Sequence, residues 1–119
     1  MTLAERLDRM RHGIAGCELA SFGDLRTGMA LRSSAARPFK QDVLEELLRQ
    51  AALHFEASDS VSGGAGHSMI LTTPRDVRIF VRSPETPSDV VCCLCAGAAS
   101  AGQVAEHADA IFRAMSGAD

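Results

Sequence analysis

The sequence contains no tryptophan and no tyrosine, and only five of its 119 residues are phenylalanine. Single-stranded nucleic acids bind through bases that stack on aromatic side chains, and few such side chains exist here. The formal net charge is −3, and no basic stripe runs along the chain, so the electrostatic attraction for DNA or RNA is also missing. We therefore exclude nucleic acids from the expected partners.

Long apolar runs are also absent from the sequence. No stretch approaches the length of a membrane span, and residues 1–10 are charged and amphipathic, without the apolar centre of a secretory signal. We therefore expect a cytoplasmic protein that makes no membrane contact. In that compartment thiols stay reduced, which predicts four free cysteines: Cys17, Cys92, Cys93 and Cys95.

The cysteines are the most suggestive cluster of reactive side chains. A metal site needs ligands that converge from one side. Along a strand, Cys93 and Cys95 share one face while Cys92 points to the other, so a third ligand requires Cys17 from a neighbouring strand. The chain has no Cys-x-x-Cys pair. We interpret these residues as small buried hydrophobic groups, and we predict no metal and no cofactor.

Other catalytic patterns are missing too. Residues 62–66 read Ser-Gly-Gly-Ala-Gly, but the Gly-Lys-Ser/Thr ending and the following helix of a phosphate-binding loop do not occur. A flexible linker is the better interpretation of this run. The four histidines lie far apart in the sequence, and none pairs with a nucleophile. We therefore predict no catalytic residues and no enzymatic activity.

Hydrophobic periodicity and turn residues predict three helices and five strands within one domain that spans residues 1–119. Thr2 and Glu5 have the spacing of a capping box at the start of the first helix, and Ser100 and Gln103 repeat it before the last. The expected elements are a helix over 2–12, strands over 16–22 and 29–33, a helix from Pro38 or Phe39 to Phe55, a glycine-rich loop over 58–67, strands over 68–72, 77–82 and 90–96, and a helix over 100–115.

For two of the expected strands, the pattern of apolar residues also predicts the position within the sheet. Residues 90–96 are apolar throughout, which is typical of a central strand covered on both faces. Residues 68–72 form a short apolar strand, which we place at an edge of the sheet. An unprotected apolar edge favours pairing with a second chain.

The second helix carries more apolar surface than one sheet contact needs. Val43 and Leu47 lie on one side of the stripe, and Leu44, Leu48 and Phe55 lie on the other. A helix that is apolar over so wide an arc sits in a deep groove or is partly covered by another chain. We therefore expect a second molecule to cover part of this helix.

The order and character of these elements resemble the roadblock (dynein light-chain) family over nearly the whole chain. The resemblance implies an α+β fold: a profilin-like five-stranded antiparallel sheet sandwiched by helices, one on one face and two on the other, in the order α-β-β-α-β-β-β-α. The residues that carry the resemblance are the hairpin of 17–33, the long helix of 43–55, the segments 69–73 and 77–81, and the strand of 90–96 that runs into 100–115.

The resemblance also implies a function. Roadblock domains are small homodimers that regulate or scaffold partners, often small Ras-like GTPases, and lack catalysis of their own. It implies a dimer in which the second helix and the third strand meet their copies. The positions that match these dimer elements are Val43, Leu47, Gln50 and His54 on the helix, and Met69 and Leu71 on the strand.

An alternative function remains open at this stage. The same profilin-like sheet could form a pocket for a small-molecule sensor or a small enzyme, which requires polar groups that converge in a cleft. The candidate residues for such a pocket are His67, Asp76, Arg78 and Cys93.

Overall fold

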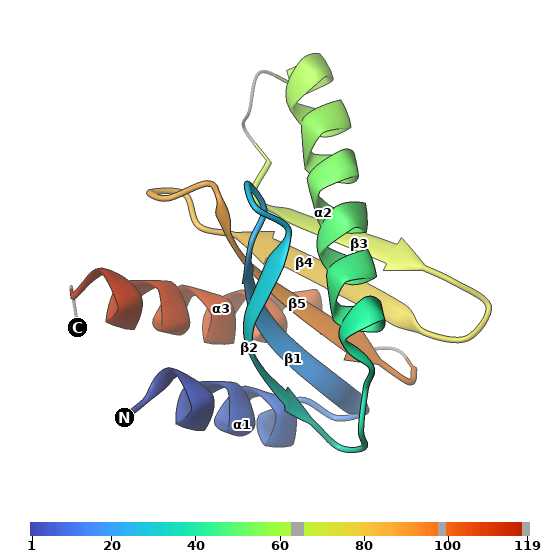
Figure 1. Cartoon of the computed structure of the whole chain (residues 1–119), viewed down its shortest axis with the longest axis vertical. Coiled ribbons are helices and arrows are strands. Elements are labelled where there is room, and N and C mark those ends of the chain that lie inside the picture. Colours follow the sequence, from blue (N-terminus) through green and yellow to red (C-terminus); the bar gives the residue numbers. More distant parts are fainter. Residues whose placement is uncertain (63–65, 98–99, 118–119) are drawn as a thin grey trace.

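The computed structural model describes residues 1–62, 66–97 and 100–117, and the elements follow the predicted order (Figure 1). The three helices are α1 (Leu3–Gly13), α2 (Gln41–Ser62) and α3 (Ala101–Ser116). The five strands are β1 (Cys17–Asp24), β2 (Met29–Ala35), β3 (Ser68–Thr72), β4 (Val77–Arg82) and β5 (Asp89–Cys95).

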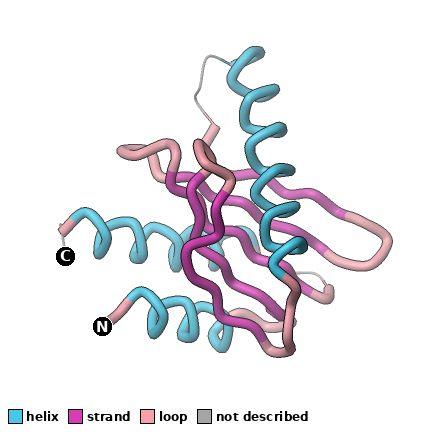
Figure 2. Tube along the Cα trace, viewed as in Figure 1, coloured by secondary structure: helices cyan, strands magenta, loops and turns pink. Residues whose placement is uncertain are grey.

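The strands form one antiparallel sheet in the order β2-β1-β5-β4-β3 (Figure 2). The two halves of the chain meet where β1 pairs with β5, in a register that places Asp24 opposite Asp89 and Cys17 opposite Cys95. Strand β5 is central and buried from Val90 to Cys95, and β3 lies at an edge. Both predicted strand positions are confirmed.

Helices cover the two faces of the sheet as the resemblance implied. Figure 1 shows α1 and α3 side by side on one face and α2 alone across the other. Each face has its own apolar cluster. The α1/α3 cluster includes Leu7, Met10, Phe22, Ile79, Cys93, Cys95, Val104, Ile111 and Phe112. The α2 cluster consists of Leu19, Leu44, Leu47, Leu48, Ala51, Phe55, Phe80, Val90, Cys92 and Leu94.

Local sequence signals account for the helix starts. The Thr2 hydroxyl accepts a hydrogen bond from the Glu5 amide at 3.1 Å, and the Glu5 carboxylate accepts one from the Thr2 amide at 3.2 Å. This reciprocal pair is the predicted capping box, and it satisfies two amides at the helix start. The Ser100 hydroxyl accepts from the Gln103 amide at 3.2 Å and begins α3 in the same manner.

The second helix differs from the prediction at both ends. It begins at Gln41 rather than Pro38 or Phe39, because the Lys40 carbonyl accepts the bond from the Val43 amide at 3.0 Å. It continues to Ser62, so the predicted loop over 58–67 is wrong for residues 58–62. Residues 63–65 of that loop lie outside the described part of the chain. Among the described residues, no helix is both long and apolar enough to cross a membrane.

Candidate functional site

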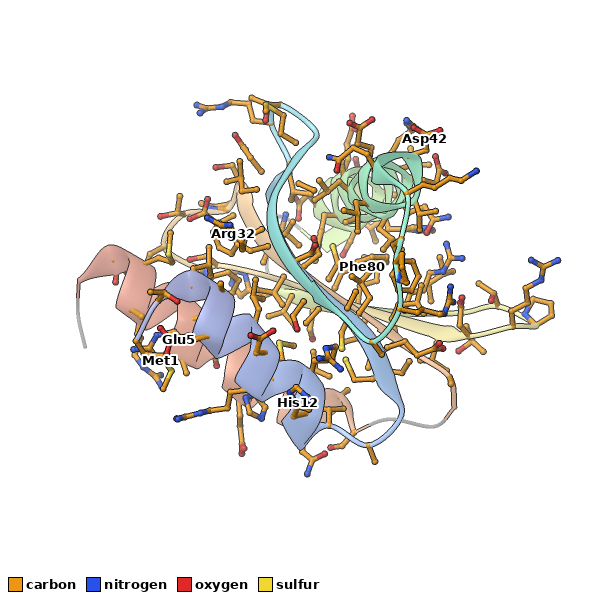
Figure 3. The ribbon with its side chains drawn as sticks, turned by 60° about the horizontal axis from the view of Figure 1, so that its bottom comes forward. Met1, Glu5, His12, Arg32, Asp42 and Phe80 are labelled. Atoms are coloured by element: carbon orange, nitrogen blue, oxygen red, sulfur yellow. The ribbon has the colours of Figure 1, made fainter. Side chains whose placement is uncertain are left out.

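Helix α2 is held against the sheet by a continuous apolar face. Leu47, Leu48 and Ala51 are each at most 2% exposed, and all three belong to the α2 cluster. Figure 3 shows Phe80 of β4 between the sheet and α2, whereas Asp42 lies on the outer side of the helix. Burial of this face fixes the rotation of α2, and it decides which side chains face outward.

The outward side of α2 carries apolar groups that the protomer does not cover. The Val43 side chain is 37% exposed and that of Leu53 is 64% exposed. The sequence therefore predicted uncovered apolar surface on α2 correctly at Val43. It was wrong about the exposure of Leu47, which is only 2% exposed, because Leu47 packs into the α2 cluster of its own protomer.

Gln50 and His54 lie on the same side of α2 and are partly buried. The Gln50 side-chain oxygen accepts a hydrogen bond from Nη1 of Arg78 at 2.7 Å, and Nε of Arg78 donates to Asp76 at 3.0 Å. Burial alone would raise the pKa of the Asp76 carboxyl, but hydrogen bonds from Arg78 and Thr73 outweigh it and lower that pKa. Asp76 is therefore ionised at neutral pH, and Arg78 holds the Gln50 amide in a fixed position.

A second arginine of β4 ties down the C-terminal half of α2. Arg82 is 5% exposed, and its guanidinium donates to both oxygens of Asp59, at 2.8 and 2.5 Å. The same group donates to the Gly66 carbonyl and lies 4.5 Å from the ring centre of Phe55. The hydrogen bond to Arg82 lowers the pKa of Asp59, and the same bond raises the pKa of Arg82. This ion pair continues α2 beyond its predicted end.

The edge strand β3 lies beside this helix. It pairs with β4 along its whole length, and within the described residues no strand pairs with its outer edge. Met69 and Leu71 are partly buried against the α2 cluster, whereas Ile70 faces the other side and is 54% exposed. The candidate interaction surface therefore consists of the outer side of α2 and the free edge of β3.

A shallow hollow of about 460 Å³ marks the N-terminal half of α2. Glu46 and Arg49 form an exposed ion pair on it. Three carboxylates, two guanidinium groups and two apolar side chains line it, so its net charge is negative. The lining residues are Asp42, Val43, Glu45, Glu46, Leu47, Arg49 and Arg78.

The four residues proposed for a sensor pocket do not converge. Asp76 and Arg78 are in contact, but Cys93 is buried in the α1/α3 cluster on the opposite face of the sheet. His67 is exposed at the start of β3. Another hollow, of about 400 Å³, lies between the loop after β4 and the C-terminal half of α3, and none of the four lines it.

The structure brings three of the four cysteines together. Cys92 points into the α2 cluster, as strand alternation predicted, and Cys93 and Cys95 point into the α1/α3 cluster. Cys17 of the neighbouring strand β1 joins the latter pair, which is the condition that the sequence set for a third ligand. The sulfurs of Cys17, Cys93 and Cys95 all lie within 4.8 Å of one another.

Comparison with known proteins gives a match in structure only. No protein-family model matches the sequence, and no curated protein does. A roadblock/LC7 domain from Streptomyces avermitilis superposes with a TM-score of 0.75 at 10% identity, covering 98% of this chain and 96% of that one. The gliding protein MglB from Thermus thermophilus gives 0.74 at 17% identity over 95% and 84%. MglC from Myxococcus xanthus gives 0.63 at 11% identity over 93% of each chain. This chain has the roadblock fold.

Within the roadblock fold, the helix and the edge strand implied for dimerisation lie next to each other. Sequence reasoning named Val43, Gln50, Met69 and Leu71 on this surface, together with His54. It missed two of the most exposed apolar groups, Leu53 and Ile70. Leu53 lies opposite the buried stripe of α2, and Ile70 alternates with Met69 and Leu71 along β3, so neither residue belongs to the apolar pattern that marked the other positions.

Proposed function

We propose that this chain, as one roadblock-like domain over residues 1–119, is a non-enzymatic regulatory or scaffold protein of the cytoplasm. It forms a homodimer and binds a small Ras-like GTPase or a similar switch protein. The observation that carries the proposal is an uncovered apolar surface beside an open strand edge: Val43 on α2 is 37% exposed, and β3 pairs with β4 alone among the described strands. Exposed apolar surface and an unpaired strand edge both favour association with a second chain.

The spacing of the α2 residues suits pairing with an identical helix. Val43, Leu47, Gln50 and His54 follow one another at intervals of four, three and four residues, a series that reads the same in both directions. In a two-fold interface, residue i meets residue j while j meets i. An antiparallel pair of α2 helices therefore places Val43 against His54 of the partner subunit. Gln50 lies over the turn of the partner helix that carries Leu47, whose side chain stays packed in its own α2 cluster.

The strand edges complete the proposed dimer. Antiparallel pairing of two β3 strands around the same two-fold axis joins the two sheets and exchanges the hydrogen bonds that the free edge makes to water for bonds between strands. Met69 and Leu71 then lie beneath both α2 helices. One neighbour of the same fold is described as MglB with a tetrameric arrangement, at a TM-score of 0.75, which supports assembly by proteins of this shape.

The resemblance and the surface charge support the proposed partner. The hollow on the N-terminal half of α2 carries three carboxylates against two guanidinium groups, so its net charge is negative and complementary to a basic surface. Val43 and Leu47 of this hollow belong to the proposed α2 contact, whereas Asp42 and Glu45 lie outside that contact and stay accessible in the two-fold dimer. We expect a switch protein to dock there, with an affinity that falls as salt rises.

The dimer is tested by a charge within its proposed interface. Val43→Glu transfers two carboxylates per dimer, one from each chain, from water into the contact between the α2 helices, which costs about 3 kcal/mol, or about 100-fold in the dissociation constant of the dimer. The matched control is Leu31→Glu, because Leu31 is 52% exposed on β2 at the opposite edge of the sheet. Sedimentation equilibrium measures both constants. Equal dissociation constants for Val43→Glu, Leu31→Glu and the parent would overturn the proposed interface.

The partner is tested separately. The small Ras-like GTPase whose gene lies nearest to that of this chain is titrated with the chain by calorimetry, in its GDP form and with a non-hydrolysable GTP analogue. We expect binding that depends on the nucleotide and weakens for Glu45→Lys, whose side chain lines the same hollow. If the chain bound neither the GDP form nor the GTP-analogue form, the partner proposal would be contradicted, whereas the dimer proposal would still stand.

A further inference from the structure

The three converging cysteines lie outside the candidate interaction surface, on the opposite face of the sheet. The sulfur of Cys17 is 3.0 Å from that of Cys93, and the sulfur of Cys93 is 3.7 Å from that of Cys95. Cys17 and Cys95 are register partners across β1 and β5. A register shift between Cys17 and Leu19 keeps Cys17 on the face of the other two thiols.

We propose that Cys17, Cys93 and Cys95 form a binding site for one soft monovalent metal ion of the copper(I) class. Thiolate sulfur is the ligand that such ions select. Structural zinc almost always takes four ligands in a tetrahedron. Among the described residues, no histidine, carboxylate or further cysteine joins the three thiols as a fourth ligand. Three sulfur donors suit an ion that accepts three ligands.

The surroundings of the cluster favour a low coordination number. Cys93 and Cys95 are at most 1% exposed, and Cys17 is 8% exposed. The rest of the α1/α3 cluster is apolar and includes Ile14 and Val104, with Val77 packed against it, so its side chains offer no fourth ligand. The Leu19 carbonyl accepts a hydrogen bond from the Cys17 thiol at 3.4 Å. A dry site with three sulfurs therefore selects against ions that retain water.

The three sulfurs already lie together, so binding of a metal ion needs little rearrangement of the chain. Metal binding displaces the thiol protons. A metal ion has a short path to the thiols from solvent, because Gly16 and Ala96, the chain neighbours of Cys17 and Cys95, are exposed. The Ala96 amide donates a hydrogen bond to the Gly16 carbonyl at this end of the sheet.

Competition for copper(I) tests the site. The reduced full-length protein is titrated without oxygen in the presence of bicinchoninate, which reports the copper(I) that the protein does not hold. We expect one ion per chain. Cys17→Ala should weaken binding about 100-fold or more, since even groups outside the ligand shell contribute up to about that factor. Cys92→Ala is the matched control, because Cys92 is also buried but lies on the other face of the sheet, and this variant should bind as the parent does.

Three results would overturn the proposal: no retention of copper(I) against bicinchoninate, equal weakening by Cys92→Ala and Cys17→Ala, or tighter retention of zinc than of copper(I). X-ray absorption at the copper edge of the loaded parent protein decides the matter independently if an alanine variant fails to fold. A single shell of three sulfur neighbours is expected. Two sulfurs, or a shell with nitrogen or oxygen, would contradict the assignment of these three ligands.

Discussion

Gly23 of β1 lies directly beneath α2 and offers a sharp test of how that helix is seated. A Cβ added at Gly23 would lie 2.6 and 2.8 Å from the two end carbons of Leu48, and 3.0 Å from the Met29 carbonyl oxygen. Gly23 has no positive φ, so the backbone itself accepts alanine. The cost of Gly23→Ala therefore comes mainly from the contact with Leu48, which is 1% exposed within the α2 cluster, and in part from the Met29 carbonyl oxygen.

The expected magnitude follows from two opposing effects. Overpacking of a filled core costs about 1–3 kcal/mol. Alanine restricts the unfolded chain more than glycine does, which raises the free energy of unfolding by about 0.4–1 kcal/mol. We therefore expect Gly23→Ala to lower the free energy of unfolding by about 1–2 kcal/mol. The matched control is Gly102→Ala in α3, where the new Cβ meets only the Ser100 hydroxyl at 3.6 Å, and stability should rise.

A double-mutant cycle with Leu48→Ala isolates the contact. Leu48→Ala alone costs about 2–5 kcal/mol because it leaves a cavity under α2. In that background the methyl group of Gly23→Ala enters vacated space, so the two changes should cost less together than separately, by about 1 kcal/mol or more. Urea unfolding followed by circular dichroism measures all four proteins. Additive costs, or a Gly23→Ala variant more stable than the parent, would refute the placement of Leu48 over β1.

Two further predictions concern charged groups. Arg82→Met should lower the free energy of unfolding by about 3 kcal/mol, because it removes the hydrogen bonds that join β4 to α2. Arg49→Met is the control and should change the free energy of unfolding by less than about 0.5 kcal/mol, because the Arg49 guanidinium is exposed. Similar urea midpoints for the two variants would contradict a stabilising role of the Arg82–Asp59 ion pair. Burial and the nearby Asp24 carboxylate raise the pKa of Asp89, so ionised Asp89 destabilises the fold at neutral pH. Asp89→Asn should raise the urea midpoint at neutral pH and leave it unchanged below the ordinary aspartate pKa of 3.8, and an equal effect at both pH values would contradict this cause.

The sequence predicted the element order because local patterns determine each element. The end of α2 is different, because it depends on a contact between distant parts of the chain. Small polar residues after Phe55 are typical of a loop, yet Arg82 of β4 binds Asp59 across 23 residues and stabilises another turn of helix. Local propensity contains no information about such a partner.

The same limit explains the errors at the candidate sites. Helical periodicity placed Leu47 on a broad apolar face, but the width of that face does not show how much of it the sheet buries. Alternation along β5 separated Cys92 from its two neighbours correctly. The position of Cys17 beside Cys93 and Cys95 depends on the pairing of β1 with β5, which are far apart in the sequence. It also depends on a register shift that no residue pattern indicates.

The molar mass of the purified chain in solution tests the central claim most directly. Light scattering coupled to size exclusion measures this mass without reference to shape, over a range of micromolar concentrations. The account predicts twice the 12.6 kDa mass of a single chain. A mass of one chain at every concentration would mean that α2 and β3 need no second copy, and it would contradict the proposed regulatory dimer.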